Sequence, residues 1–398
     1  MRFGQDPELD ELRERVRRIT RDQAPKRRGR AGVRAPEPEE IPQLRRWTAT
    51  LYGECFVGAD WPVEYGGLAH PHPQHHAVVA EELARANAPL PVGGGLLAGA
   101  AIIDHGTRDQ KDFFLPRIRS GEHIWCQLFS EPGAGSDLAG LTTRARRDGD
   151  NFIVDGQKVW TTNGQHADWG YLLARTDADA PKRRGITAFA VDMRSPGIDV
   201  RPLREITGTT DFNEVFLDSV VIPAANVIGE VNAGWLVTNS SLAKERSSAG
   251  GGLTLFRALD DLLDVARSVR VGGVRAIDRD DVRQAIGGLI ADAHVNALMS
   301  AYGESRAMHG TGDAADAALS KILFSEVNLA IAEFGMQLQG GDGVRVEGDR
   351  HAVSDGWWQD AFLYARAFTI AGGTNEVLRN LVAERALGLP RGADRGRH

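Results

Sequence analysis

The spacing of apolar residues changes twice along the 398-residue chain, at about Gly121 and again at Ala233. Before Gly121, stretches such as PQHHAVVAEELARANAPL place apolar residues three and four positions apart, which predicts helices. Between the two points, short alternating runs are separated by the Asp148-Gly149 and Asp155-Gly156 pairs, which favours β-hairpins. Helical spacing then returns. This order predicts a β unit between two helical units.

Three domains are therefore expected, because a chain of this length exceeds what one hydrophobic core usually serves. We predict an α+β fold that is mainly α: an N-terminal helical domain over 1–122, a middle antiparallel β domain over 123–231 and a C-terminal four-helix bundle over 232–398. An amphipathic helix is expected over 7–22, followed by a loop from Pro25 to Glu40. The helical patterns of the bundle cover 233–268, 279–309, 313–339, 355–369 and 374–387.

Composition argues against several classes of partner. The 47 basic and 54 acidic residues give a net charge of −7, so we expect no nucleic acid and no anionic membrane as partner. Apolar runs are too short to span a bilayer, and the charged N-terminus lacks the apolar core of a secretory signal. Cys55 and Cys126 lack the spacing of metal ligands or of a disulfide framework, so a cytoplasmic location is expected.

Two further kinds of site are not predicted. His70, His72, His75 and His76 lie in a Pro-containing loop without carboxylate or cysteine neighbours, so no metal site is expected there. No serine stands in a Gly-x-Ser-x-Gly turn, so the chain offers no Ser-His-Asp arrangement of the hydrolase kind.

The stretch WCQLFSEPGAGSDLAG, residues 125–140, is the densest candidate for binding chemistry and lies where the helical pattern gives way to the β pattern. It is not a Rossmann fingerprint, because Leu138 occupies the third glycine position and no βαβ unit follows. Its free amides, with the hydroxyls of Ser130 and Ser136, could hold a phosphate or a flavin ring. A tight turn between domains explains the spacing equally well.

SEPGAGSD, followed by DGQKVWTTNGQHADW at 155–169, resembles the flavin-binding signature of the acyl-CoA dehydrogenase family. The family fold has an N-terminal helical domain, a middle β domain and a C-terminal four-helix bundle, which agrees with the order read from the periodicity. Other segments similar to the family occur in family order along nearly the whole chain: WPVEYGG at 61–67, VVIPAANVIGEVNAGW at 220–235, QLQGGDG at 337–343 and GGTNEV at 372–377.

The resemblance implies an FAD cofactor held between domains and subunits, an acyl-CoA substrate, and an electron-transfer flavoprotein as electron acceptor. It also implies that Trp160 lies beside the flavin ring and that Thr162 reaches its reactive edge. Gln337, Gly340 and Gly341 would meet the ADP part of an FAD held mainly by a neighbouring protomer. The other implied flavin contacts are Gln127, Phe129, Ser130, Gly135 and Ser136 in the first β segment and Thr374 and Glu376 at the last helix, with Ser136 and Arg246 as substrate contacts.

The family's reaction needs a carboxylate base, because it removes a proton from the carbon α to a thioester and passes a hydride from the β carbon to the flavin. Many members carry this base as a glutamate just before a Gly-Thr pair, where this chain has Gly372. A second location in the family is a Glu-Arg pair on the first helix of the bundle, which here is Glu245-Arg246. Periodicity also favours an inward position, since Glu245 shares a heptad row with Leu259 and Ala266.

Both predicted catalytic positions have a structural alternative. A carboxylate on a buried row has a raised pKa, which suits a base near neutrality, but Glu245 could instead form an ion pair with Lys244, Arg246 or another helix. By resemblance, the bare amide of Gly372 at a helix N-terminus polarises the thioester carbonyl. The alternative there is an ordinary glycine turn capped by Thr374.

The segment from Val274 to Gly288 departs from the family, because it lacks the usual Arg-x-x-Phe-Gly element that reaches a neighbour's FAD. A similar departure occurs in branches in which two different homologous chains share cofactor sites. We therefore expect a dimer or tetramer that is either homomeric or heteromeric. Three activities stay open: an acyl-CoA dehydrogenase, an acyl-CoA oxidase, and a non-catalytic or cofactor-completing subunit of a heteromer.

Overall fold

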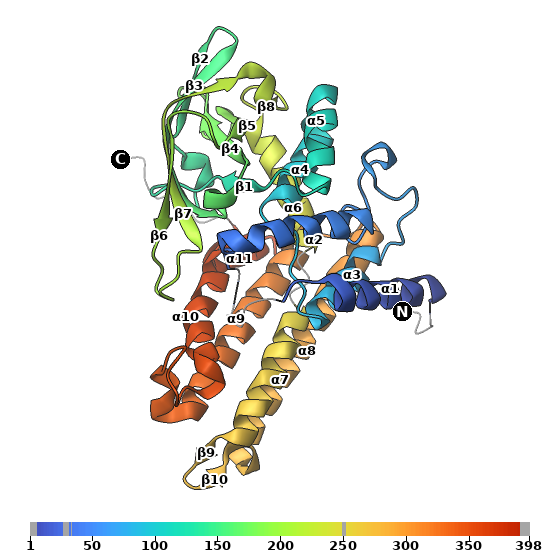
Figure 1. Ribbon diagram of the computed structural model, residues 1–398, viewed down its shortest axis with the longest axis vertical. Helices are drawn as coiled ribbons and strands as arrows, with labels where there is room; N and C mark the ends of the chain where they lie inside the picture. Colours follow the sequence, from blue (N-terminus) through green and yellow to red (C-terminus); the bar gives the residue numbers. More distant parts are fainter. Residues whose placement is uncertain (1–5, 27–31, 33, 249–251, 391–398) are drawn as a thin grey trace. The chain divides into compact units, whose positions relative to one another are not determined.

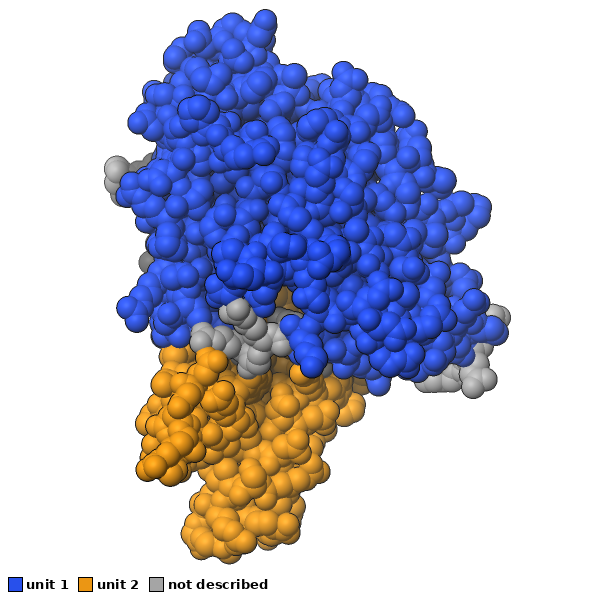
Figure 2. Space-filling view, viewed as in Figure 1, with its two compact units in different colours: residues 1–27, 33–249 blue, residues 28–32, 250–398 orange. Residues whose placement is uncertain are grey.

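The computed structural model describes residues 6–26, 32, 34–248 and 252–390, and for residues 243–248 and 252–253 it describes the backbone alone (Figure 1). The chain divides into two compact units, which Figure 2 colours separately. Met1–Arg27 and Val33–Ala249 make up the first unit, and Arg28–Gly32 and Gly250–His398 make up the second.

The helices of the first unit form around capped ends and apolar faces. At the start of α1, the carboxylate of Asp6 accepts hydrogen bonds from two amides of the first turn. Leu9, Leu12 and Val16 then recur three and four positions apart and join a core around Trp47. This confirms the helix predicted over 7–22. The bounds are α1 (Pro7–Gln23), α2 (Ile41–Gly53), α3 (His75–Arg85), α4 (Gly95–His105), α5 (Arg108–Arg119) and α6 (Gly234–Ser248).

The β part of the first unit is one sheet with the strand order β6-β7-β3-β2-β4-β5-β8, and β1 lies beside β4. Its bounds are β1 (Trp125–Leu128), β2 (Arg144–Asp148), β3 (Asn151–Thr162), β4 (Trp169–Arg175), β5 (Ile186–Asp192), β6 (Ile198–Leu203), β7 (Phe212–Pro223) and β8 (Val227–Ile228). Strand β4 pairs in parallel with β1 and, at one position, with β2, and the other pairs are antiparallel. The predicted antiparallel β domain is confirmed.

The two Asp-Gly pairs have different roles in this sheet. Asp148-Gly149 forms the predicted hairpin turn, since β2 and β3 pair from Asp148 opposite Asn151. The prediction of a turn at Asp155-Gly156 was wrong, because both residues lie inside β3, where the register with β7 shifts. A Cβ at Gly156 would lie 2.4 Å from the Oγ1 of Thr143, so the glycine permits a close approach rather than a chain reversal.

The second unit is a helical bundle in which α9 is central: α7, α8, α10 and α11 all pack against it. On α9, Gly335 makes room for the ring of Trp358, which would lie 2.0 Å from a Cβ at that position. The bounds are α7 (Gly252–Ser268), α8 (Asp280–Met308), α9 (Ala314–Gln339), α10 (Trp357–Ile370) and α11 (Asn375–Leu381), with a small hairpin of β9 (Arg270–Val271) and β10 (Val274–Arg275) after α7.

Most predicted helices of the bundle agree with the structure. The patterns at 279–309 and 313–339 match α8 and α9 within one residue at each end. The pattern at 233–268 covers α6 and α7, and residues 249–251 between them lie outside the described part of the chain. Within the described ranges, no helix is both long enough and apolar enough to cross a membrane.

Candidate active site

The segment after β1 is a tight turn that exposes backbone. The amide of Glu131 donates to the carbonyl of Ala134, and the amide of Ala134 donates back to Glu131. Phe129 just before the turn is buried, whereas Gly135 and Ser136 just after it are exposed. A Cβ at Gly135 would meet no atom within 4 Å, so open space lies beside this stretch of backbone. Gln127 and Ser130, also predicted as flavin contacts, are half-buried.

A buried ion pair holds this turn. The Nζ of Lys158 on β3 lies 2.8 Å from the Oε1 of Glu131, and their side chains are 0% and 4% exposed. The carboxylate also accepts hydrogen bonds from the amides of Thr142 and Thr143, at 2.6 and 2.9 Å. Burial alone would raise the pKa of Glu131, but the Lys158 ammonium and these hydrogen bonds lower the pKa to about 2. Burial lowers the pKa of Lys158 to about 8, and Glu131 opposes that shift, so both groups are mostly charged at pH 7.

Two neighbouring residues of β3, Lys158 and Val159, form hydrogen bonds to the backbone that leads into the turn. Besides its bond to Glu131, the Nζ of Lys158 donates to the carbonyl oxygen of Phe129 at 3.1 Å. The amide of Val159 donates to the carbonyl oxygen of Ser130 at 2.9 Å. Sequence reasoning missed Lys158 and Glu131, although each stands as a charged residue inside one of the two motifs that carry the flavin resemblance. The available signal was a lysine among the apolar residues of one motif and a glutamate in the other.

Trp160 follows Lys158 on β3 and faces outward. The register between β3 and β7 shifts between Lys158 and Thr161, and Trp160 has a left-handed backbone with φ of +61°. Its side chain is 60% exposed, and its ring lies 6.0 Å from the ring of Phe212. A left-handed conformation costs a non-glycine residue roughly 1–2 kcal/mol. The fold therefore maintains an exposed, flat indole at an energetic cost, next to the half-buried Thr162.

Glu245 and Arg246 lie in the last turns of α6, and their side chains lie outside the described residues. The described part of α6 packs against α4 and β5, with Thr238 and Ser241 among its buried residues. Glu245 follows Ser241 by four positions and Thr238 by seven. The helical register therefore places the Glu245 position on the same face of α6 as those two residues.

The heptad row that predicts an inward Glu245 continues into α7. Leu259 and Ala266 of that row are 3% and 0% exposed. Of the three acidic residues that fall off the row, Asp260 and Asp264 are exposed and Asp261 is half-buried. The part of the prediction that concerns α7 is therefore confirmed, and the part that concerns Glu245 stays a prediction.

In the second unit, the end of α9 presents an exposed glycine-rich turn. Gln337 in the last turn of α9 is exposed, and a 3-10 helix over Gly340–Val344 follows directly. Gly340 has φ of +55°, and a Cβ at Gly340 or Gly341 would meet no atom within 4 Å. The amide of Gly340 donates to the carbonyl oxygen of Gln337, and the open space beside Gly340 and Gly341 lets a ligand approach the backbone closely.

The turn before α11 contains two successive left-handed glycines, Gly372 with φ of +69° and Gly373 with φ of +98°. Thr374 then caps α11, because its Oγ1 accepts a hydrogen bond from the amide of Val377 at 3.3 Å. A Cβ at Gly372 would meet nothing within 4 Å, so the conformation and not crowding favours glycine there. Glu376 is exposed in the first turn of α11. The capped glycine turn is thus present, and it leaves open space beside Gly372.

In each unit, considered separately, the residues predicted to hold FAD have the exposure and the open space that binding a flavin nucleotide requires. The first unit offers the exposed Trp160 ring and the open backbone at Gly135, and the second offers the open glycines near the end of α9. The buried Oγ1 of Thr161 and Oδ1 of Asn163, on either side of Thr162, lack a hydrogen-bond partner among the described residues. Polar atoms of this kind are suited to bonding a ligand or a water molecule.

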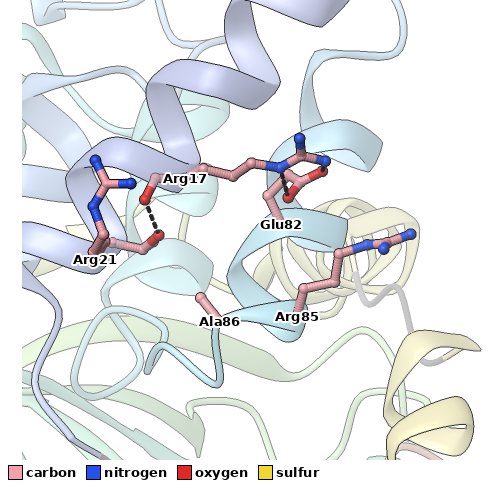
Figure 3. A pocket seen from close by; sticks show the side chains of 6 residues that line it. Arg17, Arg21, Glu82, Arg85 and Ala86 are labelled. Atoms are coloured by element: carbon pink, nitrogen blue, oxygen red, sulfur yellow. Dashed lines mark hydrogen bonds and ion pairs between the residues drawn. The ribbon is translucent and has the colours of Figure 1, made fainter.

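A pocket of about 510 Å³ lies elsewhere in the first unit, between α1 and α3 (Figure 3). Across it, Arg17 donates to both carboxylate oxygens of Glu82 at 2.8 Å, and Glu82 is 3% exposed. Arg21 and Arg85 also line it, together with Thr20 and Ala86. No residue predicted to bind flavin or substrate lines this pocket, so it is separate from the candidate site.

Comparison with known proteins covers nearly the whole described chain. Residues 6–122, 126–220 and 232–387 match the acyl-CoA dehydrogenase N-terminal, middle and C-terminal domains. The chain is 41% identical over 356 residues to "Acyl-CoA dehydrogenase FadE34" of Mycobacterium tuberculosis, an alignment that covers 89% of this chain and 47% of that protein. The chain thus spans about half the length of that relative.

Two further comparisons extend over whole proteins. The chain is 37% identical over 361 residues to "Acyl-CoA dehydrogenase IpdE1" of Mycobacterium tuberculosis, covering 90% of this chain and 91% of the relative. Among solved structures, it is similar to "Tcur3481-Tcur3483 steroid ACAD", with a TM-score of 0.85, 30% identity, and coverage of 98% of this chain and 100% of that one. The chain therefore belongs to the acyl-CoA dehydrogenase family of flavoprotein oxidoreductases.

Proposed function

We propose that this chain binds FAD and dehydrogenates an acyl-CoA thioester between its α and β carbons, with Glu245 as the base. The α proton moves to the Glu245 carboxylate as the β carbon loses a hydride, and a carbon–carbon double bond forms. When bound, FAD would supply the acceptor for that hydride, and an electron-transfer flavoprotein would be the final recipient of the electrons.

The absence of a side chain at Gly372 is the observation that supports Glu245 as the base. Gly372 stands just before Gly373 and Thr374, where many family members carry the catalytic glutamate. Its left-handed turn leaves open space at that point, so an acid must reach the α carbon from elsewhere. Glu245 provides one from α6, on the face of Thr238 and Ser241. Within this proposal Arg246 and Ser136 contact the substrate.

We assign the flavin contacts by the same reasoning. In the first unit Trp160 offers its indole face to the flavin ring, and Thr162 offers its hydroxyl to the reactive edge. The loop held by Lys158 supplies further contacts from its amides and hydroxyls. The full set comprises Gln127, Phe129, Ser130, Gly135, Ser136, Trp160 and Thr162 in the first unit, and Gln337, Gly340, Gly341, Thr374 and Glu376 in the second.

Gly372 acts in this proposal through its amide, which donates to the thioester carbonyl and stabilises the negative charge that develops when the α proton leaves. Gly372→Ala is expected to lower kcat roughly 10- to 100-fold, because a left-handed alanine is strained and moves the amide away from its acceptor. Anaerobic single-turnover bleaching of the flavin measures this loss.

Gly348→Ala is the matched control for Gly372→Ala. Gly348 has φ of +86° and open space around its Cβ position, yet it lies outside the candidate site. It should carry a similar backbone strain with less than about a threefold effect on kcat. Equal losses in the two variants would contradict a specific role for the Gly372 amide.

For the acyl group we propose a bulky, ring-bearing chain. The similar solved structure is named as a steroid ACAD, and the space left by Gly372 accommodates a wider acyl group than a glutamate at that position would. Anaerobic bleaching across thioesters from short straight chains to polycyclic ones tests this directly. Fastest bleaching by a short straight chain would contradict it.

The same experiment in air separates a dehydrogenase from an oxidase. Hydrogen peroxide formed at the rate of bleaching would identify an oxidase instead.

We also propose that a second, homologous chain completes the cofactor sites. The segment at Val274–Gly288, which covers β10 and the start of α8, lacks Arg-x-x-Phe-Gly, and the similar solved structure is named for a pair of chains. The chain purified alone is expected to retain well below one FAD per chain, with recovery when the homologous partner is added. A homotetramer carrying one FAD per chain, measured by absorbance and native mass spectrometry, would rule this out.

A further inference from the structure

The turn that carries Gly372 is held from outside by a lysine. The Nζ of Lys321 on α9 donates to the carbonyl oxygen of Gly373 at 2.8 Å and to the Oδ1 of Asn375 at 2.9 Å. Lys321 is half-buried. Its two acceptors lie 52 and 54 positions further along the chain.

Asn375 links this lysine to the rest of α9. It is 4% exposed, and its Oδ1 also accepts a hydrogen bond from the Oγ of Ser325 at 3.1 Å. Ser325 is fully buried and lies one helical turn after Lys321 on the same face of α9. The Nδ2 of Asn375 also donates to the Oε1 of Glu326 on α9 at 3.5 Å. The start of α11 is therefore anchored to α9 at several points through Asn375, whereas the carbonyl of the preceding glycine turn is held by Lys321.

Two consecutive glycines cannot fix a turn by themselves. Gly372 and Gly373 have no side chains to restrict their backbone angles, and Gly372 has no atom within 4 Å of a Cβ position to support it. The peptide between them can therefore rotate unless a neighbouring carbonyl is held. A hydrogen bond from an ammonium is stronger than one between neutral groups, and burial strengthens it further. Burial also lowers the pKa of Lys321, against the effect of Glu376.

We infer that Lys321 is a positioning residue for the reaction: by holding the Gly373 carbonyl it keeps the Gly372 amide directed at the thioester oxygen. This inference rests on the proposed role of Gly372 and extends it to a side chain that touches neither substrate nor flavin in the proposal. Lys321 acts on the reaction only through the backbone of the turn.

Lys321→Met removes the ammonium that makes both hydrogen bonds and keeps a side chain of similar length. In the FAD-loaded protein it is expected to slow anaerobic flavin bleaching roughly 10- to 100-fold, because a displacement of about 1 Å can cost that much. Binding should change selectively: the affinity for the thioester falls, whereas the affinity for a thioether analogue with a methylene in place of the carbonyl stays within about twofold. FAD content and melting temperature should stay near those of the unmodified protein. An equal loss of affinity for the thioester and for the thioether analogue, or an unchanged rate of bleaching, would overturn the inference.

Two further variants keep the test decisive if Lys321→Met folds poorly. Lys321→Arg retains a cationic donor and should recover most of the bleaching rate. Ser325→Ala loosens the anchor of Asn375 but leaves the bond to the Gly373 carbonyl, so its effect should stay below about threefold. A loss in Ser325→Ala as large as that in Lys321→Met would mean that the network merely anchors α11. If none of the acyl-CoA thioesters bleaches the flavin of the unmodified protein, the proposed function fails. Normal bleaching in all three variants would refute only the role of Lys321.

Discussion

Glu245→Gln is expected to abolish turnover while FAD binding and folding persist. Glutamine keeps the size of the side chain but cannot accept a proton, so the rate should fall by about 10²- to 10⁴-fold. The measurement is anaerobic bleaching of the flavin by an acyl-CoA that the unmodified protein oxidises. Retention of FAD, read from the absorbance of the variant purified together with its homologous partner, separates a missing base from a damaged cofactor site.

Asp260→Asn is the control for the Glu245 substitution. Asp260 is an exposed carboxylate on α7 that falls off the inward heptad row, so neutralising it should leave the rate of bleaching within about twofold of the unmodified protein.

The Glu245→Gln experiment also decides between an enzyme and a silent partner subunit. A subunit that only completes another chain's cofactor site should lose nothing on conversion of Glu245 to glutamine.

Glu131→Gln is expected to be the most destabilising of these substitutions. It leaves the ammonium of Lys158, which is 0% exposed, without its counter-ion. Breaking a buried ion pair at one partner typically costs about 3–5 kcal/mol of the free energy of unfolding. For a unit of this size that corresponds to a fall in melting temperature of roughly 10 °C, measured by calorimetry. FAD retention should fall as well, because Lys158 also holds the carbonyl of Phe129.

An exposed pair in the same unit provides the control for Glu131→Gln. Asp137 and Lys182 lie 2.8 Å apart with side chains 64% and 69% exposed. Asp137→Asn should cost less than about 1 kcal/mol, because water screens an exposed pair. The double variant Glu131→Gln with Lys158→Met should regain part of the lost stability, since it removes the unpaired charge. A Glu131→Gln variant as stable as Asp137→Asn would contradict a structural role for the buried pair.

The buried pair also predicts a dependence of stability on pH. The pKa of Glu131 is about 2 in the folded protein, below the 4.5 of an ordinary glutamate. The unfolded chain therefore binds more protons in this range, so the contribution is complete above about pH 4.5 and is lost as the pH falls toward 2. In Glu131→Gln the loss of unfolding free energy between about pH 4.5 and 2 should be smaller. If the unfolding free energies of Glu131→Gln and of the unmodified protein depend on pH in the same way, the buried pair does not cause this loss.

Local pattern predicted much of the fold but not the features that depend on register. Periodicity located α8 and α9 within a residue at each end, because long amphipathic helices repeat their signal many times. It failed at Asp155-Gly156, where the same dipeptide that makes a hairpin turn accommodates a bulge within β3. The outward position of Trp160 depends on a second register shift, which strand alternation alone could not reveal.

Some residues of the candidate site could also be predicted from the sequence, and others could not. Resemblance to a family identified the glycines and aromatic residues of contiguous motifs, and the conformations of Gly372 and Trp160 suit the roles proposed for them. The supporting charges were not found from the sequence. Lys158 meets Glu131 across 27 positions and Lys321 meets Gly373 across 52, so only the folded topology brings them together.

Removal of the α proton by Glu245 can be measured separately from hydride transfer. An acyl-CoA whose β carbon bears no hydrogen, built on the acyl group that bleaches the flavin fastest, can lose only its α proton. In deuterated water, the unmodified FAD-loaded protein should exchange the α hydrogen for deuterium, detected by mass spectrometry. Glu245→Gln should not exchange it, and Asp260→Asn should exchange it normally. Undiminished exchange with glutamine at position 245 would contradict the claim.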